Sequence, residues 1–358
     1  MKTIVLYLNS MKNAGGIERV VSNLLIEWSK NYNLYLIVKD DANNSFYYIP
    51  NNVKRISINS PLTLNMKNRL QRIFAVLINQ ARSIKALRKC LNSIDFDYIY
   101  TTTPLNSYEV HKANKNLDKK MVISEHASAY AVNRVYRYLK NKVYPKARCI
   151  SVPNKSDCKV YRDMGCNTIY LPHINSFPKR KMNNCNSKIA LNIGRLTPDK
   201  RQDELIRIWN SVNRNGWELW IVGSGEEKKR LETIIETYNL SDSVKLFDFT
   251  QNISKVFEKA SLFLFTSRME GFGMVLLEAM SFGIPCISYD CPSGPRDLII
   301  NGVNGYLIEN NNINAFVKKL NTVLTSSSLE YLSVGAYETA NSWNNEDIIN
   351  KWNSIFEQ

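Results

Sequence analysis

The feature that most constrains the fold of this chain is a repeated alternation of short apolar runs with longer amphipathic ones. Ile4–Leu8 and Leu34–Val38 are short apolar runs, whereas residues 17–30 carry apolar side chains at helical spacing. A short continuous apolar run is typical of a buried parallel strand, and the helical segments between such runs are typical of crossover connections. The pattern predicts an α/β protein.

The alternation is interrupted once, by a stretch with the composition of a linker. This stretch contains Pro178, a basic triplet and an asparagine-rich run, and the strand pattern restarts at Ile189–Ile193. The length of 358 residues also favours two domains, at about 150 residues per domain. We expect two Rossmann-like, doubly wound domains that face each other across a cleft, where the ligands of such sheets bind. The expected boundaries are 1–172 for the first domain, 173–187 for the linker and 188–336 for the second domain, with a closing helix, 337–358, that could pack back on the first.

The excess of basic residues lies in the first half of the chain. Residues 1–185 contain 30 Lys and Arg against 11 Asp and Glu, whereas residues 186–358 contain 17 against 21. A strongly positive half favours an anionic partner such as nucleic acid, lipid headgroups or an acidic glycan. A nucleic-acid-binding protein is the remote alternative, because no zinc-finger or RNA-recognition signature is present.

Composition excludes several other classes of protein. With 44% apolar and 22% charged residues the chain can bury large cores, which excludes a disordered protein. No apolar stretch is long enough for a membrane span or a signal sequence, so we expect a cytoplasmic protein. The seven cysteines include no Cys-x-x-Cys pair and no zinc spacing, so we expect reduced thiols.

The most informative motif is a glycine-bearing turn in front of an apolar helix, within Thr266–Met280. Free backbone N–H groups at a helix start bind anions, and glycine lets a ligand approach the backbone closely. Glu270 and Glu278 are eight residues apart, so they can address two parts of one extended ligand, and carboxylates accept hydrogen bonds from sugar hydroxyls. The alternatives are a helix-capping role for Glu270 and a solvated helix position for Glu278.

A second cluster, Asn192–Arg201, follows the first strand of the second domain. Its Arg195 and Lys200 can clamp a diphosphate, the arginine through paired hydrogen bonds and the lysine as a point charge. The alternative is a solvated basic loop. The later segment Val222–Glu226 contains only Gly-x-Gly, a weak dinucleotide signature that predicts a tight strand-to-helix turn.

The first domain offers two candidate positions at strand ends. Gly16 lies in a glycine loop after the first strand, which suits either phosphate approach or simple turn geometry. His126 follows the strand at 121–123, where ligands of doubly wound sheets bind, so it is a catalytic candidate with a structural role as the alternative. His111 and His173 lack such a placement.

One acidic pair could hold a metal ion. Asp95 and Asp97 flank a single residue, and such a pair can bind Mn²⁺ or Mg²⁺ together with a nucleotide diphosphate. The pair precedes a strand, however, and therefore lies at the end of the sheet opposite the expected cleft. We predict no metal site and no cofactor.

Taken in order along the chain, these motifs resemble the GT-B glycosyltransferases, in particular the large retaining family 4. The resemblance covers nearly the whole chain, and the ordered set is specific although each motif alone is common. The set comprises Gly-Gly after the first strand, Ser-Glu-His, Gly-Arg-Leu-x-x-x-Lys, Glu-Gly-Phe-Gly-x-x-x-x-Glu, Gly283-x-Pro285 and Asn301-Gly302-x-Asn304-Gly305.

The resemblance implies a retaining transferase that moves a hexose or N-acetylhexosamine from a nucleotide-diphosphate sugar, expected to be UDP-linked. The second domain would hold this donor. The first would hold a glycan acceptor, expected to be lipid-linked, in bacterial polysaccharide or glycoconjugate biosynthesis. The implied catalytic residues are His126, beside the transferred sugar, and Glu270, on one of its hydroxyls. The implied donor-binding residues are Gly16, Arg195, Lys200, Gly271, Phe272, Gly273 and Glu278, with Arg195 and Lys200 on the diphosphate and Glu278 on the ribose.

The predicted chemistry needs no metal, because Arg195, Lys200 and a helix N-terminus supply positive charge to the leaving diphosphate. No carboxylate is marked as a nucleophile for a double displacement. The resemblance therefore favours a same-face mechanism in which the departing phosphate assists deprotonation of the acceptor. The sequence departs from the common family pattern at Cys291–Ile299, where many members have Gly-Gly-x-x-Glu, so the donor sugar stays open. The alternatives are a GT-B enzyme with a soluble acceptor and a sugar-nucleotide epimerase.

Residues 66–90 are predicted to form a basic amphipathic helix. Its apolar residues recur at steps of three and four, and its polar face carries basic residues and no acid. Such a helix is typical of a membrane-surface element, which would place the enzyme at the inner face of the cell membrane, on anionic lipid. The alternative is that its apolar face packs on the sheet. The predicted acceptor or membrane contacts are Arg72, Arg82, Lys85 and Arg88, and the patch could extend to Arg134, Arg137, Lys140 and Lys142.

Overall fold

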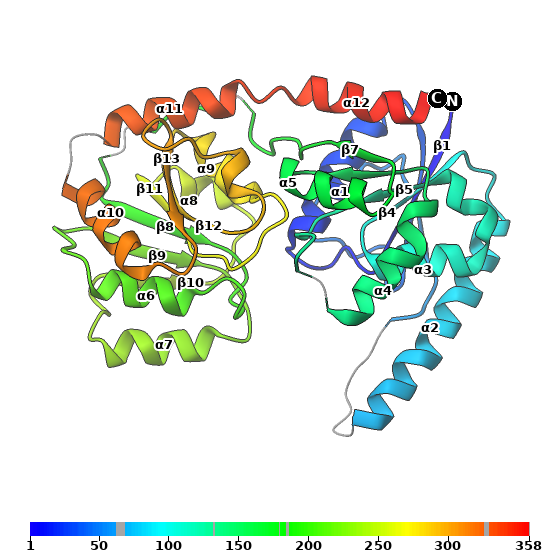
Figure 1. The fold of residues 1–358 in the computed structure, drawn as a ribbon, viewed down its shortest axis with the longest axis horizontal. Coiled ribbons are helices and arrows are strands. Elements are labelled where there is room, and N and C mark those ends of the chain that lie inside the picture. Colours follow the sequence, from blue (N-terminus) through cyan, green and yellow to red (C-terminus); the bar gives the residue numbers. More distant parts are fainter. Residues whose placement is uncertain (62–68, 132, 179, 184–185, 326–328, 358) are drawn as a thin grey trace. The chain divides into compact units, whose positions relative to one another are not determined.

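The computed structural model describes residues 1–61, 69–131, 133–178, 180–183, 186–325 and 329–357, and of residues 69–75 and 77 it describes the backbone. The chain divides into two compact units (Figure 1). The first unit comprises Met1–Ile174 and Glu346–Gln358, and the second comprises Asn175–Asn345. Most of the predicted linker, 173–187, is therefore counted with the second unit.

A parallel sheet forms the centre of the first unit. In its described residues the strands lie in the order β3-β2-β1-β4-β5-β6-β7, and neighbouring strands are parallel. The order reverses between β1 and β4, as in a doubly wound fold. The strands are β1 (Thr3–Leu8), β2 (Asn33–Val38), β3 (Lys54–Ser57), β4 (Tyr98–Thr101), β5 (Met121–Ser124), β6 (Cys149–Val152) and β7 (Thr168–Tyr170).

The helices of the first unit begin at residues that suit helix starts. Thr103 accepts a hydrogen bond from the backbone N–H of Asn106, and Asn133 and Asn154 cap the two following helices in the same way. The helices are α1 (Gly16–Trp28), α2 (Arg69–Asn92), α3 (Pro104–Ala113), α4 (Arg134–Val143), α5 (Lys155–Asp163) and α12 (Asn345–Glu357), with 3₁₀ turns at Lys115–Lys120 and Tyr144–Lys146.

The end of the chain packs on the first unit through aromatic side chains. Trp28 of α1 makes edge-to-face contacts with Trp352 and Phe356 of α12, at ring-centroid distances of 5.2 and 5.0 Å. Lys2 also donates a hydrogen bond to the carbonyl oxygen of Phe356. The predicted closing helix, 337–358, is in the structure two helices, because α11 ends at Asn341 and α12 begins at Asn345.

The second unit is built on another parallel sheet. Its described strands lie in the order β10-β9-β8-β11-β12-β13, which again reverses once. Both units are thus Rossmann-like α/β folds, as the sequence predicts. The strands are β8 (Ile189–Ile193), β9 (Glu218–Val222), β10 (Val244–Phe247), β11 (Leu262–Phe265), β12 (Cys286–Asp290) and β13 (Gly305–Glu309).

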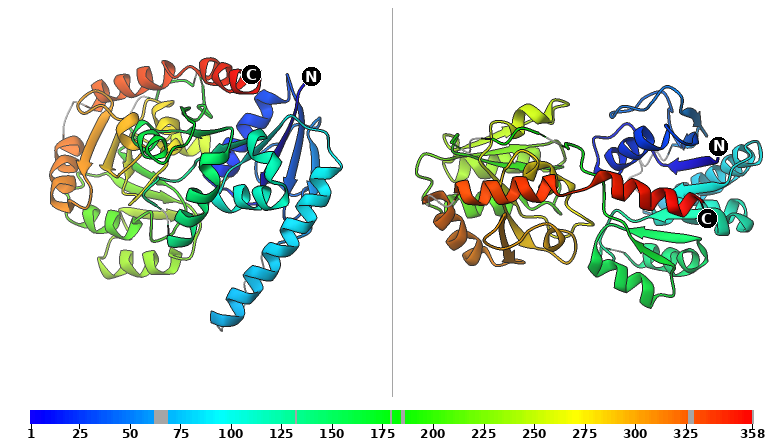
Figure 2. Two further views of the ribbon diagram at one scale, coloured as in Figure 1. Left: turned by 45° about the vertical axis from the view of Figure 1, so that its right-hand side comes forward. Right: turned by 90° about the horizontal axis from the view of Figure 1, so that it is seen from above.

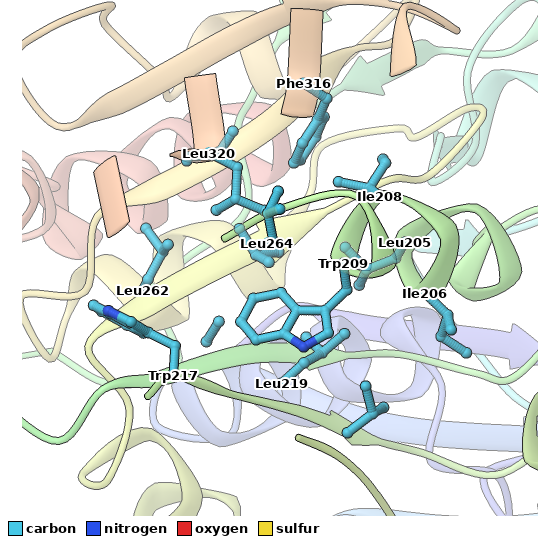
Figure 3. Close-up of a cluster of buried hydrophobic side chains, with 14 of the residues drawn as sticks. Leu205, Ile206, Ile208, Trp209, Trp217, Leu219, Leu262, Leu264, Phe316 and Leu320 are labelled. Atoms are coloured by element: carbon cyan, nitrogen blue, oxygen red, sulfur yellow. The ribbon is translucent and has the colours of Figure 1, made fainter. Parts of the chain in front are cut away.

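Helices cover both faces of the second sheet. On one face Trp209 and Leu205 of α6 pack with Leu219, Leu264 and Phe316 in a fully buried cluster (Figure 3). The other face packs mainly against α8, α9 and α11. The helices are α6 (Gln202–Asn210), α7 (Lys228–Thr237), α8 (Ile253–Phe257), α9 (Met274–Met280), α10 (Ile313–Thr325) and α11 (Leu329–Asn341), with a 3₁₀ turn at Pro295–Asp297.

No helix within the described ranges combines the length and the apolar character that crossing a membrane requires.

Candidate functional site

The loop that carries Arg195 is fastened to the neighbouring strand end by backbone hydrogen bonds. Gly194 donates to the carbonyl oxygen of Val222 at 3.1 Å, and Leu196 donates to that of Ser224 at 2.9 Å. A Cβ on Gly225 would lie 2.2 Å from the carbonyl oxygen of Leu196, so only glycine permits this close approach. The Gly-x-Gly segment therefore allows its backbone to pack closely against the loop that carries Arg195.

The same loop is tied on its other side to the end of β11. The hydroxyl of Thr266 donates to the carbonyl oxygens of Lys200 and Arg201, each at 3.1 Å, and the N–H of Arg268 donates to that of Asp199 at 2.8 Å. The two predicted clusters of the second unit therefore lie side by side, although about 70 residues separate them in sequence.

An ion pair joins the two clusters. Lys200 Nζ lies 2.5 Å from Glu270 Oε1, and the two side chains are only 18% and 14% exposed. Arg195 is more open, with 64% of its side chain exposed and its guanidinium 3.9 Å from Asp199. The alternative in which Glu270 caps a helix is therefore wrong, because its carboxylate pairs with Lys200.

The charges of the Arg195 loop stabilise one carboxylate. Burial acts to raise the pKa of Asp199, but the hydrogen bond from Thr197 and the charges of Lys200 and Arg195 outweigh it, so the pKa lies below its usual value. Asp199 is thus an anion under ordinary conditions. It holds the loop together rather than offering a proton.

The turn that follows Glu270 is buried. Phe272 is 2% exposed and packs against Trp343 at a ring-centroid distance of 5.6 Å, and Gly273 has φ +86° at the start of α9. Glu278 on α9 is only 4% exposed, so the solvated helix position considered for it is wrong.

The segment in which this chain departs from the common family pattern lies directly against that turn. Gly294 has φ +93°, and a Cβ there would lie 2.6 Å from the carbonyl oxygen of Phe272. Cys291 is buried, and burial, together with the charge of Glu270, raises the pKa of its thiol to about 12. The departure therefore adjoins Glu270, the residue predicted to bind the transferred sugar.

In the first unit the partly buried His126 forms a pair of imidazoles with the buried His173. Its ring stacks on that of His173 with centroids 5.1 Å apart and an interplanar angle of 17°. Burial lowers the pKa of His126 to about 4, although the charge of Glu125 acts in the opposite direction. Sequence reasoning missed His173, because nothing in the sequence indicates that its segment returns to the end of β5.

Gly16 and the acidic pair occupy different parts of the first sheet. Gly16 is exposed at the start of α1, and a Cβ there would meet no atom within 4 Å. Asp97 accepts a hydrogen bond from the backbone N–H of Thr3 at 2.8 Å, which ties the starts of β4 and β1 together. This contact gives Asp97 a structural role.

The helix predicted over residues 66–90 corresponds to α2. Residues 66–68 of the prediction and the side chain of Arg72 lie outside the part of the chain that the structure describes. Leu87 is fully buried in the core of the first unit, whereas Ile78 is 52% exposed. Helix α2 therefore packs on the unit through its C-terminal half, and Figure 2 shows its other half extending away from that unit.

The basic residues of this surface have different environments. Arg82, Lys85 and Arg88 are all exposed, but Arg88 also donates hydrogen bonds to the carbonyl oxygens of Ala113 and Lys112 at the end of α3. The predicted extension of the patch to Lys140 is wrong. Lys140 is 4% exposed, and its ammonium is paired with Glu125 at 2.7 Å.

In the second unit the cation of Lys200 is thus paired with Glu270, whose carboxylate can accept hydrogen bonds from hydroxyl groups. The exposed Arg195 lies on the same loop as Lys200. Such a set can bind an anionic group and a polyhydroxylated group of one ligand. Residues 174–340 match the family described as glycosyl transferases group 1, and this match includes the whole set.

Comparison with curated proteins extends the likeness to the whole chain. The amylovoran biosynthesis glycosyltransferase AmsD of Erwinia amylovora is 27% identical, with 99% of each chain covered. The GalNAc-alpha-(1->4)-GalNAc-alpha-(1->3)-diNAcBac-PP-undecaprenol alpha-1,4-N-acetyl-D-galactosaminyltransferase of Campylobacter jejuni is 26% identical, with 88% of this chain and 87% of the relative covered.

A solved structure shares the fold over its full length. The structure of an S. aureus TarM variant in complex with fondaparinux, alpha-GlcNAc-glycerol and UDP has a TM-score of 0.80, at 16% sequence identity and with 100% of each chain covered. The fold is the GT-B fold that the sequence predicts.

Proposed function

This chain is a glycosyltransferase with the GT-B fold, and we propose that it transfers a hexose or N-acetylhexosamine from a UDP-linked donor, with retention, to a lipid-linked glycan. The observation that carries this proposal is the Lys200–Glu270 pair beside Arg195 at the strand ends of the second unit. The pair combines a cation for a diphosphate with a carboxylate for a sugar hydroxyl.

In the proposed mechanism Arg195 and Lys200 bind the diphosphate and stabilise the charge that develops as the glycosidic bond breaks. Glu270 accepts a hydrogen bond from the transferred sugar, and Glu278 accepts one from the ribose. Before the donor binds, Glu270 neutralises Lys200 and keeps both side chains in place. The departing phosphate then takes the proton of the acceptor hydroxyl, and the new bond forms on the same face of the sugar.

The relatives support the choice of donor and acceptor. TarM was crystallised with UDP, the name of the Erwinia relative refers to amylovoran biosynthesis, and the name of the Campylobacter relative refers to a PP-undecaprenol-linked glycan. We therefore place the reaction in bacterial polysaccharide or glycoconjugate synthesis and infer a lipid-linked acceptor.

Transfer is expected to persist without divalent cations, because protein groups supply the positive charge at the diphosphate. The test incubates the purified chain with radiolabelled UDP-sugars and a polyprenyl-diphosphate glycan, in excess EDTA or with Mn²⁺, and measures label in the lipid fraction. Asp95→Asn is the matched control and should be nearly silent. Complete loss in EDTA with rescue by Mn²⁺ would contradict metal independence, and a new UDP-sugar formed without an acceptor would favour the epimerase alternative.

We further propose that α2 binds the anionic surface of the membrane that carries the acceptor. Within the described side chains of α2, Arg82 and Lys85 are exposed on the same helix as the half-exposed Ile78. Basic and apolar side chains together are typical of a helix that lies at a membrane surface. Each basic residue near an anionic leaflet contributes about 1 kcal/mol of attraction.

The double variant Arg82→Gln and Lys85→Gln is therefore expected to bind phosphatidylglycerol vesicles about tenfold or more weakly than the wild type. Co-sedimentation at low salt measures this, with phosphatidylcholine vesicles as the neutral comparison. The variant Lys229→Gln and Lys255→Gln removes the same charge from exposed positions of the second unit and should bind like the wild type. Equal binding by both double variants would remove the membrane role of α2.

A further inference from the structure

The stacked pair His126 and His173 brings together two segments that are distant along the chain. His126 follows β5, and His173 follows β7, near the point where the chain leaves the first unit. His173 is buried and His126 is partly buried, and their rings lie almost parallel, with an interplanar angle of 17° and centroids 5.1 Å apart. Face-to-face contact of this kind restricts the rotation of both rings.

The backbone beside His126 is held from another direction by its neighbour Glu125. The carboxylate of Glu125 accepts hydrogen bonds from Lys140 and Tyr161, both at 2.7 Å, and a further one from Tyr144. All four side chains are buried. This network fixes the position of residue 125. None of these hydrogen bonds reaches the ring of His126, so the ring's orientation depends on its own contacts, of which the stack with His173 is one.

The ring of His126 has a polar atom that the protein leaves unused. Nε2 is buried and has no hydrogen-bond partner among the residues that the structure describes. A buried polar atom without a partner costs stability, so its presence points to a ligand that supplies the missing hydrogen bond. A neutral imidazole can either donate to a hydroxyl group or accept from one.

We propose that His173 is a positioning residue, whose ring holds the imidazole of His126 in the plane that lets Nε2 form a hydrogen bond with a hydroxyl group of the sugar substrate. The proposal rests on the proposed function, sugar transfer, and on the position beside the transferred sugar that the family resemblance implies for His126. His173 acts through its flat ring, not through a proton.

The charged groups around the pair agree with a neutral stack. Burial lowers the pKa of both histidines, and His126 lowers the pKa of His173 further. Glu125 opposes this for His126, but its carboxylate is already paired with Lys140. The stack is therefore expected to stay neutral through the pH range in which an ordinary histidine becomes charged.

Two substitutions separate ring stacking from other roles of His173. His173→Ala removes the ring and is expected to lower kcat about 10- to 100-fold with little change in the KM for the UDP-sugar, the scale of a small misplacement of a reacting group. His173→Phe keeps a flat ring without nitrogen and is expected to restore kcat to within about threefold of the wild type. Thermal unfolding of both variants shows whether a loss of kcat reflects a loss of fold.

A second measurement does not depend on transfer activity. The chain contains three histidines, so ¹⁵N-histidine labelling gives few signals, and His111→Gln and His173→Phe assign the His126 ring. In the donor-free protein, His126 is expected to remain neutral at pH 5.5 in the wild type and in His173→Phe. In His173→Ala the pKa of His126 is expected to rise toward about 6.5, because without the neighbouring ring the imidazole is more exposed to solvent.

The outcomes distinguish the two levels of the proposal. Wild-type kcat in His173→Ala, or an equal loss in both variants, would overturn the positioning role, as would an unchanged titration of His126 in His173→Ala. If the wild type transfers sugar from no UDP donor while His126 titrates as expected, the transfer proposal fails and the stacking of the two rings stands.

Discussion

Replacing Lys200 by alanine is expected to lower kcat/KM for sugar transfer at least about 100-fold, the scale of losing one charge-stabilising group at a transition state. The side chain is 18% exposed and its ammonium lies 2.5 Å from Glu270, so the substitution removes a largely buried positive charge from the proposed diphosphate site. The same substitution leaves the carboxylate of Glu270 without its cation, and this unpaired negative charge repels a diphosphate. Both effects reduce the rate in the same direction.

Glu270 is expected to show the complementary behaviour. Glu270→Gln keeps a group that accepts a hydrogen bond from a sugar hydroxyl but releases Lys200, so it should impair transfer less than Glu270→Ala, which is expected to lose at least about 100-fold. Steady-state kinetics with a labelled UDP-sugar measure both. Lys159→Ala is the control, because Lys159 also forms a lysine–carboxylate pair, with Asp163 at 2.8 Å, and both side chains are exposed on the surface of the first unit. Near-wild-type transfer by the double variant Arg195→Ala and Glu270→Ala would remove this site assignment.

Replacing Glu125 by alanine is expected to lower the free energy of unfolding by about 3–5 kcal/mol, the cost of leaving a buried charge without its partner. Glu125 and Lys140 are 3% and 4% exposed. Tyr144 and Tyr161 also lose their acceptor, and burial together with Glu125 raises the pKa of both phenols, so they remain donors that need one.

Urea unfolding followed by circular dichroism measures this effect. The control is Glu27→Ala, which removes an exposed pair with Lys30 at 2.6 Å and should change the free energy of unfolding by at most about 1 kcal/mol. Glu125→Gln restores acceptors for the tyrosines but not the charge, so it should fall between the wild type and Glu125→Ala. A loss below about 1 kcal/mol in Glu125→Ala would contradict the account of a single buried network.

The two sheets could be predicted from the sequence because each buried parallel strand is a short apolar run. Ile189–Ile193, predicted as the first strand of the second domain, is β8 with the same bounds. Helix boundaries were harder. The closing segment has no proline between its two helices, and the break after Asn341 falls at a cluster of Asn and Ser residues, a signal that the prediction of one helix did not use.

The residues of the proposed donor site could be named from the sequence, but their contacts with one another could not. Arg195, Lys200 and Glu270 stand at strand ends, which the apolar runs locate. The pairing of Lys200 with Glu270 joins residues 70 apart, and it depends on the order of β8 and β11 in the sheet. The order of strands in a sheet cannot be derived from a local sequence pattern.

Buried polar residues were the least predictable part. Lys140 belongs to a run of basic residues that is typical of a solvated face, yet it lies inside the first unit because Glu125 supplies its partner from another element. His173 follows a proline in a segment without regular structure, so its stacking on His126 could not be read from spacing. Such residues are placed by tertiary contacts alone.

The measurement that tests the central claim most directly is calorimetric titration of UDP onto the wild type, Lys200→Ala and Lys159→Ala, in the absence of divalent cations. The account predicts saturable binding of one UDP per chain to the wild type and to Lys159→Ala. It predicts a dissociation constant at least about tenfold higher for Lys200→Ala, the effect of losing one hydrogen bond between charged groups. Equal dissociation constants for all three proteins would contradict the assignment of Lys200 to the diphosphate, and absence of binding to the wild type would contradict a UDP-linked donor.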